Sequence, residues 1–138
     1  MLDDLDAIVA AARDVAARGT HLCVVSGGLG PTSDDRTAEA FAALCEVALR
    51  RDAAAAEHVR SWLEGRGRAV TDNQYKQADR PANATLIANG RGTAPGFDLV
   101  FQGCRFVCLP GIPSEFDAMV EAAIVAPMRA AALPRPLV

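Results

Sequence analysis

The sequence predicts an α/β fold, and three observations support this prediction. The run from Leu22 to Val25 is apolar and rich in β-branched residues, which is typical of a buried strand. A glycine-rich stretch, Ser26–Thr37, follows it and leads into an alanine-rich segment, Ala38–Leu44, with the character of a helix. Apolar residues make up 51% of the 138 residues and aromatic residues only 5%, as in sheets covered by alanine-rich helices.

The first half of the chain is predicted to begin with an amphipathic helix. This helix should start at Asp3–Asp4 and stop at Arg18–Gly19, where a basic last turn precedes a glycine. A strand is expected over about 21–25, and a helix over about 35–50. Asp52 should cap the next helix, which ends in a flexible basic turn. Phe41 and Trp62 are expected in the core.

The second half is predicted to contain a short helix, a strand, a hairpin and a long last helix. Each segment is bounded by a proline or glycine signal. In order, the expected segments are a helix from Thr71 to before Pro81, strands at 84–88, 97–102 and 105–109, a turn at Gly103–Cys104, and a helix at 114–131.

Composition excludes several classes of function. The formal net charge is −3, which gives no sign of a nucleic-acid-binding surface. No apolar run reaches the roughly 18 residues of a membrane span, and the start lacks a signal pattern. We therefore expect a cytoplasmic protein.

The cysteines and histidines suggest neither a zinc site nor a catalytic triad. The cysteines have no paired spacing, and neither histidine has ligand spacing with them or a setting suited to activating a serine. We expect buried thiols in a reducing compartment. The residues concerned are Cys23, Cys45, Cys104, Cys108, His21 and His58.

The glycine-rich stretch is a candidate anion site. Three glycines within four residues, Gly27, Gly28 and Gly30, allow positive φ and bring bare N–H groups close to a ligand. A strand followed by such a loop and a helix start is a common anion site in open sheets. The loop is not a Walker loop, because no lysine precedes Lys76, and Pro31 is incompatible with the dinucleotide fingerprint.

Two carboxylates, Asp34 and Asp35, follow the glycines. Carboxylates beside a bound phosphate would repel it unless a cation lay between them, which makes them candidate Mg²⁺ ligands. Alternatively, Asp35 or Thr37 only caps the following helix. The loop by itself leaves both interpretations open.

Four motifs follow one another along the chain: Gly27–Thr32 with Asp34–Thr37, Lys76–Ala78 with Pro81, Asn89 with Gly92–Phe97, and Leu109–Glu115. Together they resemble the competence/damage-inducible protein A (CinA) branch of the molybdopterin-binding fold. Leu29 fits this branch rather than the molybdopterin adenylyltransferases, which usually carry threonine there. Asp3 fits the family's aspartate at the start of the helix before the glycine loop.

The resemblance implies a three-layer, mostly parallel sheet with helices on both faces and a C-terminal hairpin, in one domain over 1–138. The family's first strand and helix have no counterpart, so we expect an N-terminally shortened domain. An exposed sheet edge would then favour a homo-oligomer.

The resemblance also implies a pocket for a phosphorylated pterin or a nucleotide, possibly molybdopterin itself. The activity it implies for this branch is metal-dependent cleavage of ADP-ribose-type pyrophosphates, and the alternative is a non-catalytic molybdopterin- or nucleotide-binding module or an inactive fragment. Asp35 and Asp3 would hold a divalent cation, Mg²⁺ by preference, and Lys76 would neutralise the departing phosphate. The ligand-binding residues would be Ser26, Gly27, Gly28, Gly30, Thr37, Gln77, Asn89, Gly92, Thr93, Ala94, Pro95, Pro110 and Gly111. Asn89 and Thr93 could instead simply close a turn.

Overall fold

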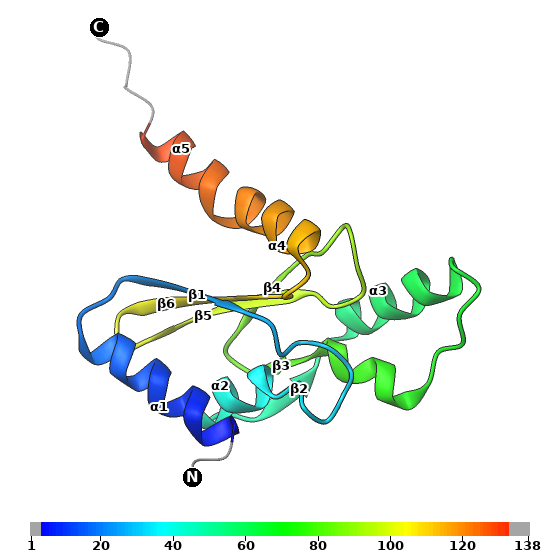
Figure 1. Cartoon of the computed structure of the whole chain (residues 1–138), viewed down its shortest axis with the longest axis horizontal. Helices are drawn as coiled ribbons and strands as arrows, with labels where there is room; N and C mark the ends of the chain where they lie inside the picture. Colours follow the sequence, from blue (N-terminus) through cyan, green and yellow to red (C-terminus); the bar gives the residue numbers. More distant parts are fainter. Residues whose placement is uncertain (1–3, 133–138) are drawn as a thin grey trace, which may run out of the picture.

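The computed structural model describes residues 4–132, which form three layers (Figure 1). Helices α1 (Asp4–Ala17) and α2 (Thr37–Cys45) pack on one face of a four-stranded sheet. Helix α4 (Pro113–Val120) packs on the other face. The predicted α/β class with helices on both faces is confirmed.

The four-stranded sheet is mixed. β1 runs parallel to β6, whereas β6–β5 and β5–β4 are antiparallel. Among the described residues, the expected parallel pairing is thus limited to β1–β6, because β4, β5 and β6 follow one another through short connections that suit antiparallel neighbours. The strands, in the spatial order β1-β6-β5-β4, are Leu22–Ser26, Cys104–Leu109, Gly96–Phe101 and Thr85–Ile87.

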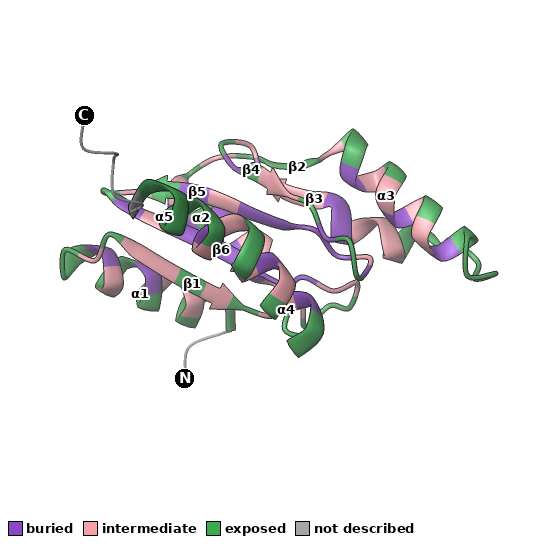
Figure 2. Cartoon of the chain, turned by 90° about the horizontal axis from the view of Figure 1, so that it is seen from above, coloured by how far each residue is buried: buried purple, intermediate pink, exposed green. Residues whose placement is uncertain are grey.

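Strand β6 is buried on both faces and joins the two helical layers (Figure 2). Side chains alternate along a strand, so Phe106 faces α1 and α2 while Val107 and Leu109 face α4, all at 0% exposure. Phe41 packs against Phe106 with ring centroids 5.2 Å apart, which confirms Phe41 as a core residue. Burying each of these side chains contributes about 1.5–3 kcal/mol.

The predicted hairpin is confirmed, but its turn lies one residue earlier in the chain than predicted. β5 and β6 are joined by Gln102 and Gly103, with φ of 48° and 80°. Two successive positive φ values match the right-handed twist of the flanking strands.

Helix α2 ends before its predicted end. Glu46 adopts φ 55°, and its amide and that of Val47 donate to carbonyls of the last turn. The chain then forms β2 (Leu49–Arg51), which pairs antiparallel with β3 (Asp79–Pro81) in a separate two-stranded sheet. The prediction of a helix to residue 50 is therefore wrong at its C-terminal end.

The remaining elements follow the predicted order. The predicted short helix is a 3₁₀ segment, and the last helix contains one π turn just before Pro127, which has no N–H to donate within the helix. No helix within residues 4–132 is long and apolar enough to cross a membrane. The bounds are α3 Ala53–Glu64, η1 Asp72–Ala78, η2 Glu121–Val125 and α5 Ala126–Ala132.

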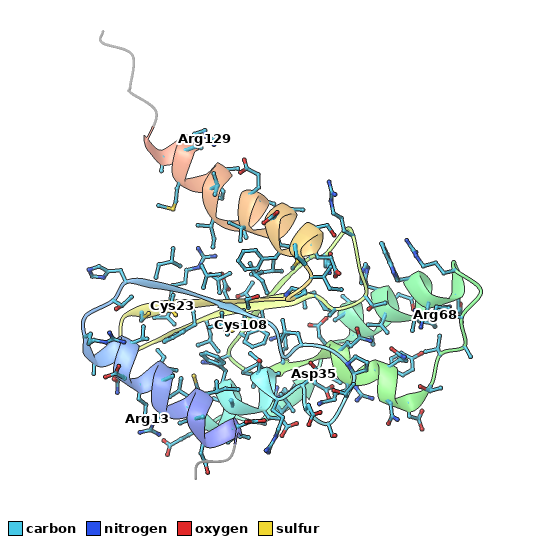
Figure 3. The ribbon with its side chains drawn as sticks, viewed as in Figure 1. Arg13, Cys23, Asp35, Arg68, Cys108 and Arg129 are labelled. Atoms are coloured by element: carbon cyan, nitrogen blue, oxygen red, sulfur yellow. The ribbon has the colours of Figure 1, made fainter. Side chains whose placement is uncertain are left out.

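All four cysteines are free thiols. Cys104 and Cys108 are buried, as predicted, whereas Cys23 and Cys45 are half-buried. Burial raises the pKa of Cys104 and of Cys108 above the ordinary range, and the nearby Cys23 adds to it (Figure 3). These thiols therefore stay protonated, which suits inert packing groups.

The predicted cap of α3 is confirmed and can be tested. Asp52 Oδ1 accepts the Ala55 N–H at 2.9 Å, and its Oδ2 pairs with Arg80 at 3.0 Å. We expect Asp52→Ala to lower the free energy of unfolding by about 1–2 kcal/mol, measured by urea denaturation. Asp52→Asn, which keeps the cap acceptor and loses the charge, should lie in between. Equal stability of wild type and Asp52→Ala would contradict this role.

Candidate functional site

Three loops meet at one edge of the four-stranded sheet. The parallel strands β1 and β6 both end at this edge, and β5, which is antiparallel to β6, begins there. β4 also ends there, since Ile87 pairs with Gly96 at the start of β5. The loops brought together are residues 27–36, 88–95 and 110–112.

The first and third loops touch. Gly27 N–H donates to the Leu109 carbonyl at 2.8 Å, which extends the β1–β6 ladder by one bond. A Cβ at Gly111 would lie 3.4 Å from the Gly27 Cα. The prediction that the Gly27 N–H binds a ligand is therefore wrong, because this donor is already used.

The three loops and the end of α3 enclose a cavity of about 890 Å³. This volume suits a ligand of nucleotide size. Lys76 and Pro95 line a smaller neighbouring cavity of about 150 Å³ instead. Of the predicted residues, the larger cavity is lined by Gly27, Gly28, Gly30, Asp35, Gln77, Gly92, Thr93, Ala94, Pro110 and Gly111.

Of the predicted residues that the structure describes, three line neither cavity. Asp3 lies outside the described residues. Ser26 is exposed at the end of β1. Thr37 and Asn89 are buried, at 3% and 2% exposure, and their polar groups bond within the protein.

The first loop needs glycine at position 28. Gly28 has φ +73°, and a Cβ there would lie 2.0 Å from Thr37 Oγ1. That hydroxyl donates to the Gly27 carbonyl at 2.9 Å, and the Thr37 N–H donates to the Gly28 carbonyl at 3.1 Å. Thr37 thus anchors the loop to the start of α2 and lines neither cavity. The predicted alternative that Asp35 or Thr37 caps this helix is wrong, because its N-cap is Arg36 and no side chain makes the cap hydrogen bond.

Two backbone donors of this loop belong to residues that line the larger cavity and have no acceptor in the described part of the chain. Among the described residues, no acceptor takes a hydrogen bond from the N–H of Gly28 or of Leu29. Both residues line the larger cavity, and Gly28 is only half-buried. The loop can therefore offer these two amides to an anion.

Asp35 stands beside these amides. Its Oδ2 accepts from the Thr32 N–H at 3.0 Å and from the Thr32 hydroxyl at 2.8 Å. Burial alone would raise the pKa of Asp35, but the hydrogen bonds from Thr32 and Gly30 and the charge of Lys76 lower it. Asp35 is therefore ionised at neutral pH.

The fit of these residues to Mg²⁺ rests on Asp35. Within residues 4–132, no three or more His, Cys, Asp or Glu side chains are grouped so as to hold a metal ion. Mg²⁺ commonly uses only one or two carboxylates together with phosphate oxygens of the substrate. A single ionised carboxylate beside a phosphate cradle fits an ion of that kind, and Asp35 would be its ligand.

Lys76 lies behind the first loop. Its Nζ donates to the carbonyls of Thr32 and Asp35, from the 3₁₀ helix that precedes β3. These bonds brace the loop from the side of the smaller cavity. That Lys76 neutralises a departing phosphate stays a prediction.

The second loop is held from within and from α4. Asn89 Nδ2 donates to the Ala94 carbonyl at 2.9 Å and to Glu115 Oε1 at 2.7 Å. A Cβ at Gly92 would lie 1.9 Å from the same Glu115 oxygen, so a larger residue there would displace the Glu115 carboxylate. Asn89 therefore closes the loop. This agrees with the second of the two interpretations that the sequence left open, a turn residue rather than a ligand-binding one.

Two further contacts hold this loop against neighbouring helices. The Thr93 hydroxyl donates to Gln77 Oε1 at 2.7 Å, and His58 Nε2 lies 2.7 Å from the Gly92 carbonyl. Gln77 and Thr93 still line the cavity, so these partners can also face a ligand. The second loop is thus a fixed wall.

Sequence reasoning missed part of the cavity wall. Trp62 is half-buried and lines the cavity, so its assignment to the core is wrong. The wall also includes Arg66 and Arg68 from the turn after α3, Arg91 from the second loop, and Glu115. The signal available was a basic turn directly after a helix that carries the chain's one tryptophan.

Comparison with known proteins identifies the family. The family model described as a probable molybdopterin binding domain matches residues 1–130. The chain belongs to this family. The resemblance seen in the motifs is confirmed.

The relatives of this molybdopterin-binding domain include CinA-like proteins. One from Akkermansia muciniphila is 42% identical over 112 residues, covering 80% of this chain and 27% of the relative. Another from Anaeromyxobacter dehalogenans is 44% identical over 119 residues, covering 86% and 29%. The chain thus spans less than a third of the length of these curated relatives.

Solved structures show the same fold. The protein CinA from Thermoplasma acidophilum superposes with a TM-score of 0.75 at 40% identity, covering 86% of this chain and 69% of that one. The molybdopterin biosynthesis enzyme MoaB of Thermus thermophilus has a TM-score of 0.50 at 23% identity, covering 92% and 65%. The latter likeness concerns the fold alone.

The close approach at Gly28 gives a test of the first loop. We expect Gly28→Ala to displace Thr37 and to lower the free energy of unfolding by about 2 kcal/mol or more. Gly19→Ala is the matched control, because Gly19 has φ +77° and nothing within 4 Å of an added Cβ. Gly19→Ala should lower the free energy of unfolding by about 1 kcal/mol, because only the unfavourable positive φ contributes there. Equal losses in chemical denaturation would refute the clash.

The lowered pKa of Asp35 gives a pH test. A carboxylate whose pKa is depressed in the folded state adds stability above its unfolded pKa and loses it as the pH falls through the folded value. The difference in unfolding free energy between wild type and Asp35→Asn should therefore be full at pH 7 and shrink below about 3.8, the ordinary value. Exposed Asp34, which has no hydrogen bond to the described residues, supplies the control Asp34→Asn. If the difference in unfolding free energy between wild type and Asp35→Asn does not change with pH, the lowered pKa of Asp35 is contradicted.

Proposed function

We propose that this domain binds a phosphorylated pterin or a nucleotide, with a phosphate on the N–H groups of Gly28 and Leu29. The observation that carries the proposal is a pair of unused backbone donors on two residues that line a cavity of about 890 Å³ at the end of a parallel strand pair. Such donors favour negatively charged oxygens, and the shape of the loop is set by Thr37 before any ligand arrives.

The family supports the class of ligand. Its description names molybdopterin binding, and molybdopterin is a phosphorylated pterin. The relatives named CinA-like extend well beyond this chain, so their activity comes to it only as a proposal. A pterin ring and a nucleotide base are of similar size, and both would fit beside the phosphate in this cavity.

We further propose that the domain hydrolyses ADP-ribose-type pyrophosphates. Asp35 favours this second function, because it is an ionised carboxylate beside the glycine loop and makes no salt bridge to the described residues. Water would attack one phosphorus, the bond to the bridging oxygen would break, and AMP and ribose 5-phosphate would leave. A Mg²⁺ ion, when bound, would supply charge neutralisation at the phosphoryl oxygens.

The chain's own residues would position this reaction. The amides of Gly28 and Leu29 would hold non-bridging oxygens where negative charge accumulates. Lys76 keeps the loop shape through its bonds to the Thr32 and Asp35 carbonyls, so its removal should act on affinity through the loop. Pro110 and Gly111 close the cavity from the side of β6.

One experiment tests both functions. Titration calorimetry with AMP measures binding, and chromatography of ADP-ribose incubated with Mg²⁺ follows AMP release. We expect wild type to bind AMP and to release AMP from ADP-ribose, with release lost on chelation by EDTA. Asp35→Asn should reduce release by about 100-fold or more, the usual loss when one electrostatic group of a transition state is removed.

The control is Asp34→Asn, which removes one exposed charge from the same loop and should retain turnover. Binding without AMP release would support the non-catalytic module and reject hydrolysis. Failure to bind AMP, ADP-ribose or molybdopterin would reject both functions.

A further inference from the structure

The wall of the larger cavity opposite the glycine loop carries three arginines. Arg66 and Arg68 come from the turn after α3, and Arg91 comes from the second loop (Figure 3 labels Arg68). All three are exposed and line the same cavity as Gly28. The proposed phosphate site on the glycine loop does not use them.

These arginines differ from most others in the protein. In the described part of the chain none of the three makes a salt bridge, although Asp35 and Glu115 also line the cavity. Elsewhere in the described residues, Arg13 and Arg50 also lack a salt bridge, whereas seven arginines pair with carboxylates between 2.5 and 3.5 Å, apart from one short pair. The paired arginines are Arg18, Arg36, Arg51, Arg60, Arg80, Arg105 and Arg129. The cationic charge at this wall is therefore not neutralised by the protein itself.

The backbone positions of the wall are held in place. Arg68 N–H donates to the Leu63 carbonyl at 2.9 Å, and Arg91 N–H donates to the buried amide oxygen of Asn89 at 2.9 Å. Arg66 stacks on Trp62, with its guanidinium carbon 3.5 Å from the ring centroid. Arg66 Nη1 also donates to the Trp62 carbonyl at 3.3 Å. The remaining N–H groups of the stacked guanidinium are the ones left for an anion.

We propose that Arg66, Arg68 and Arg91 form a second anion subsite, which takes a phosphate group separate from the one on the glycine loop. Preferred ligands of this cavity would then be nucleotides or pterins that carry two phosphate groups. This inference rests on the proposed binding function and adds the class of ligand. Guanidinium groups suit it because they bind phosphate oxygens in pairs and remain charged at all accessible pH values.

The test compares ligands that differ in one phosphate. Titration calorimetry measures the Kd of AMP, of ADP and of adenosine 3′,5′-bisphosphate. The gain in affinity from a second phosphate is the Kd of AMP divided by the lower Kd of the two ligands that carry two phosphates. We expect a gain of about tenfold or more in wild type, as for one charge-assisted hydrogen bond to phosphate. In Arg68→Ala/Arg91→Ala the gain should fall to nearly one, while AMP affinity changes little.

Arg13→Ala/Arg50→Ala is the matched control. Arg13 lies on α1 and Arg50 on β2, and both are exposed (Figure 3 labels Arg13). Neither lines one of the two cavities at the glycine loop, and neither makes a salt bridge to the described residues. This variant loses the same charge and should keep the wild-type gain. The gain should also shrink with added salt in wild type, as expected of charge pairing near the surface.

The outcomes separate the two proposals. A gain near one in wild type, or a full gain in Arg68→Ala/Arg91→Ala, overturns the second subsite while AMP binding still supports the first. A gain lost equally in the control variant also overturns it, because net charge alone would then explain the effect. If no ligand binds to wild type, the proposed function fails and the subsite fails with it.

Discussion

The parallel register of β1 and β6 is the constraint on which the site depends. Its last bond, from Gly27 N–H to the Leu109 carbonyl, brings the glycine loop against Pro110–Gly111. A shift of one residue would turn every side chain of β6 to the opposite face and expose the core contacts of Phe106 and Val107. The core thus determines the register, and the register places two walls of the cavity side by side.

Most polar groups around the glycine loop serve its shape. Thr37 bonds to Gly27, Lys76 bonds to two loop carbonyls, and Asp35 accepts from Thr32. Because these groups satisfy one another, the loop holds its conformation without a ligand, and little ordering entropy remains to oppose binding. Among the loop residues that line the larger cavity, Gly28 and Leu29 have backbone N–H groups without an acceptor in the described part of the chain. Backbone groups are the same in every residue, so the sequence does not indicate which of them stay unused.

Local chemistry made part of this predictable. The strand, the glycine loop, the Asp52 cap and the hairpin each depend on residues close in sequence, and all four are present. The end of α2 was missed because Glu46 takes the left-handed conformation that glycine would have signalled. The sequence left the roles of Thr37 and Asn89 open and placed Trp62 in the core, because these roles depend on partners or spaces formed by distant segments. Residue type indicates what a side chain can do, whereas packing decides which partner it meets.

Charge shows the same limit of sequence reasoning. A net charge of −3 suggests a protein that repels anions. Exposed charges more than about 8 Å apart are largely screened from each other at physiological salt. A ligand therefore responds to the charged groups around the cavity and not to the net charge of the whole protein. Most arginines are neutralised in pairs distributed over the surface, and the ones facing the cavity are not. An acidic protein can therefore present a locally cationic pocket, provided that its carboxylates are committed to partners elsewhere.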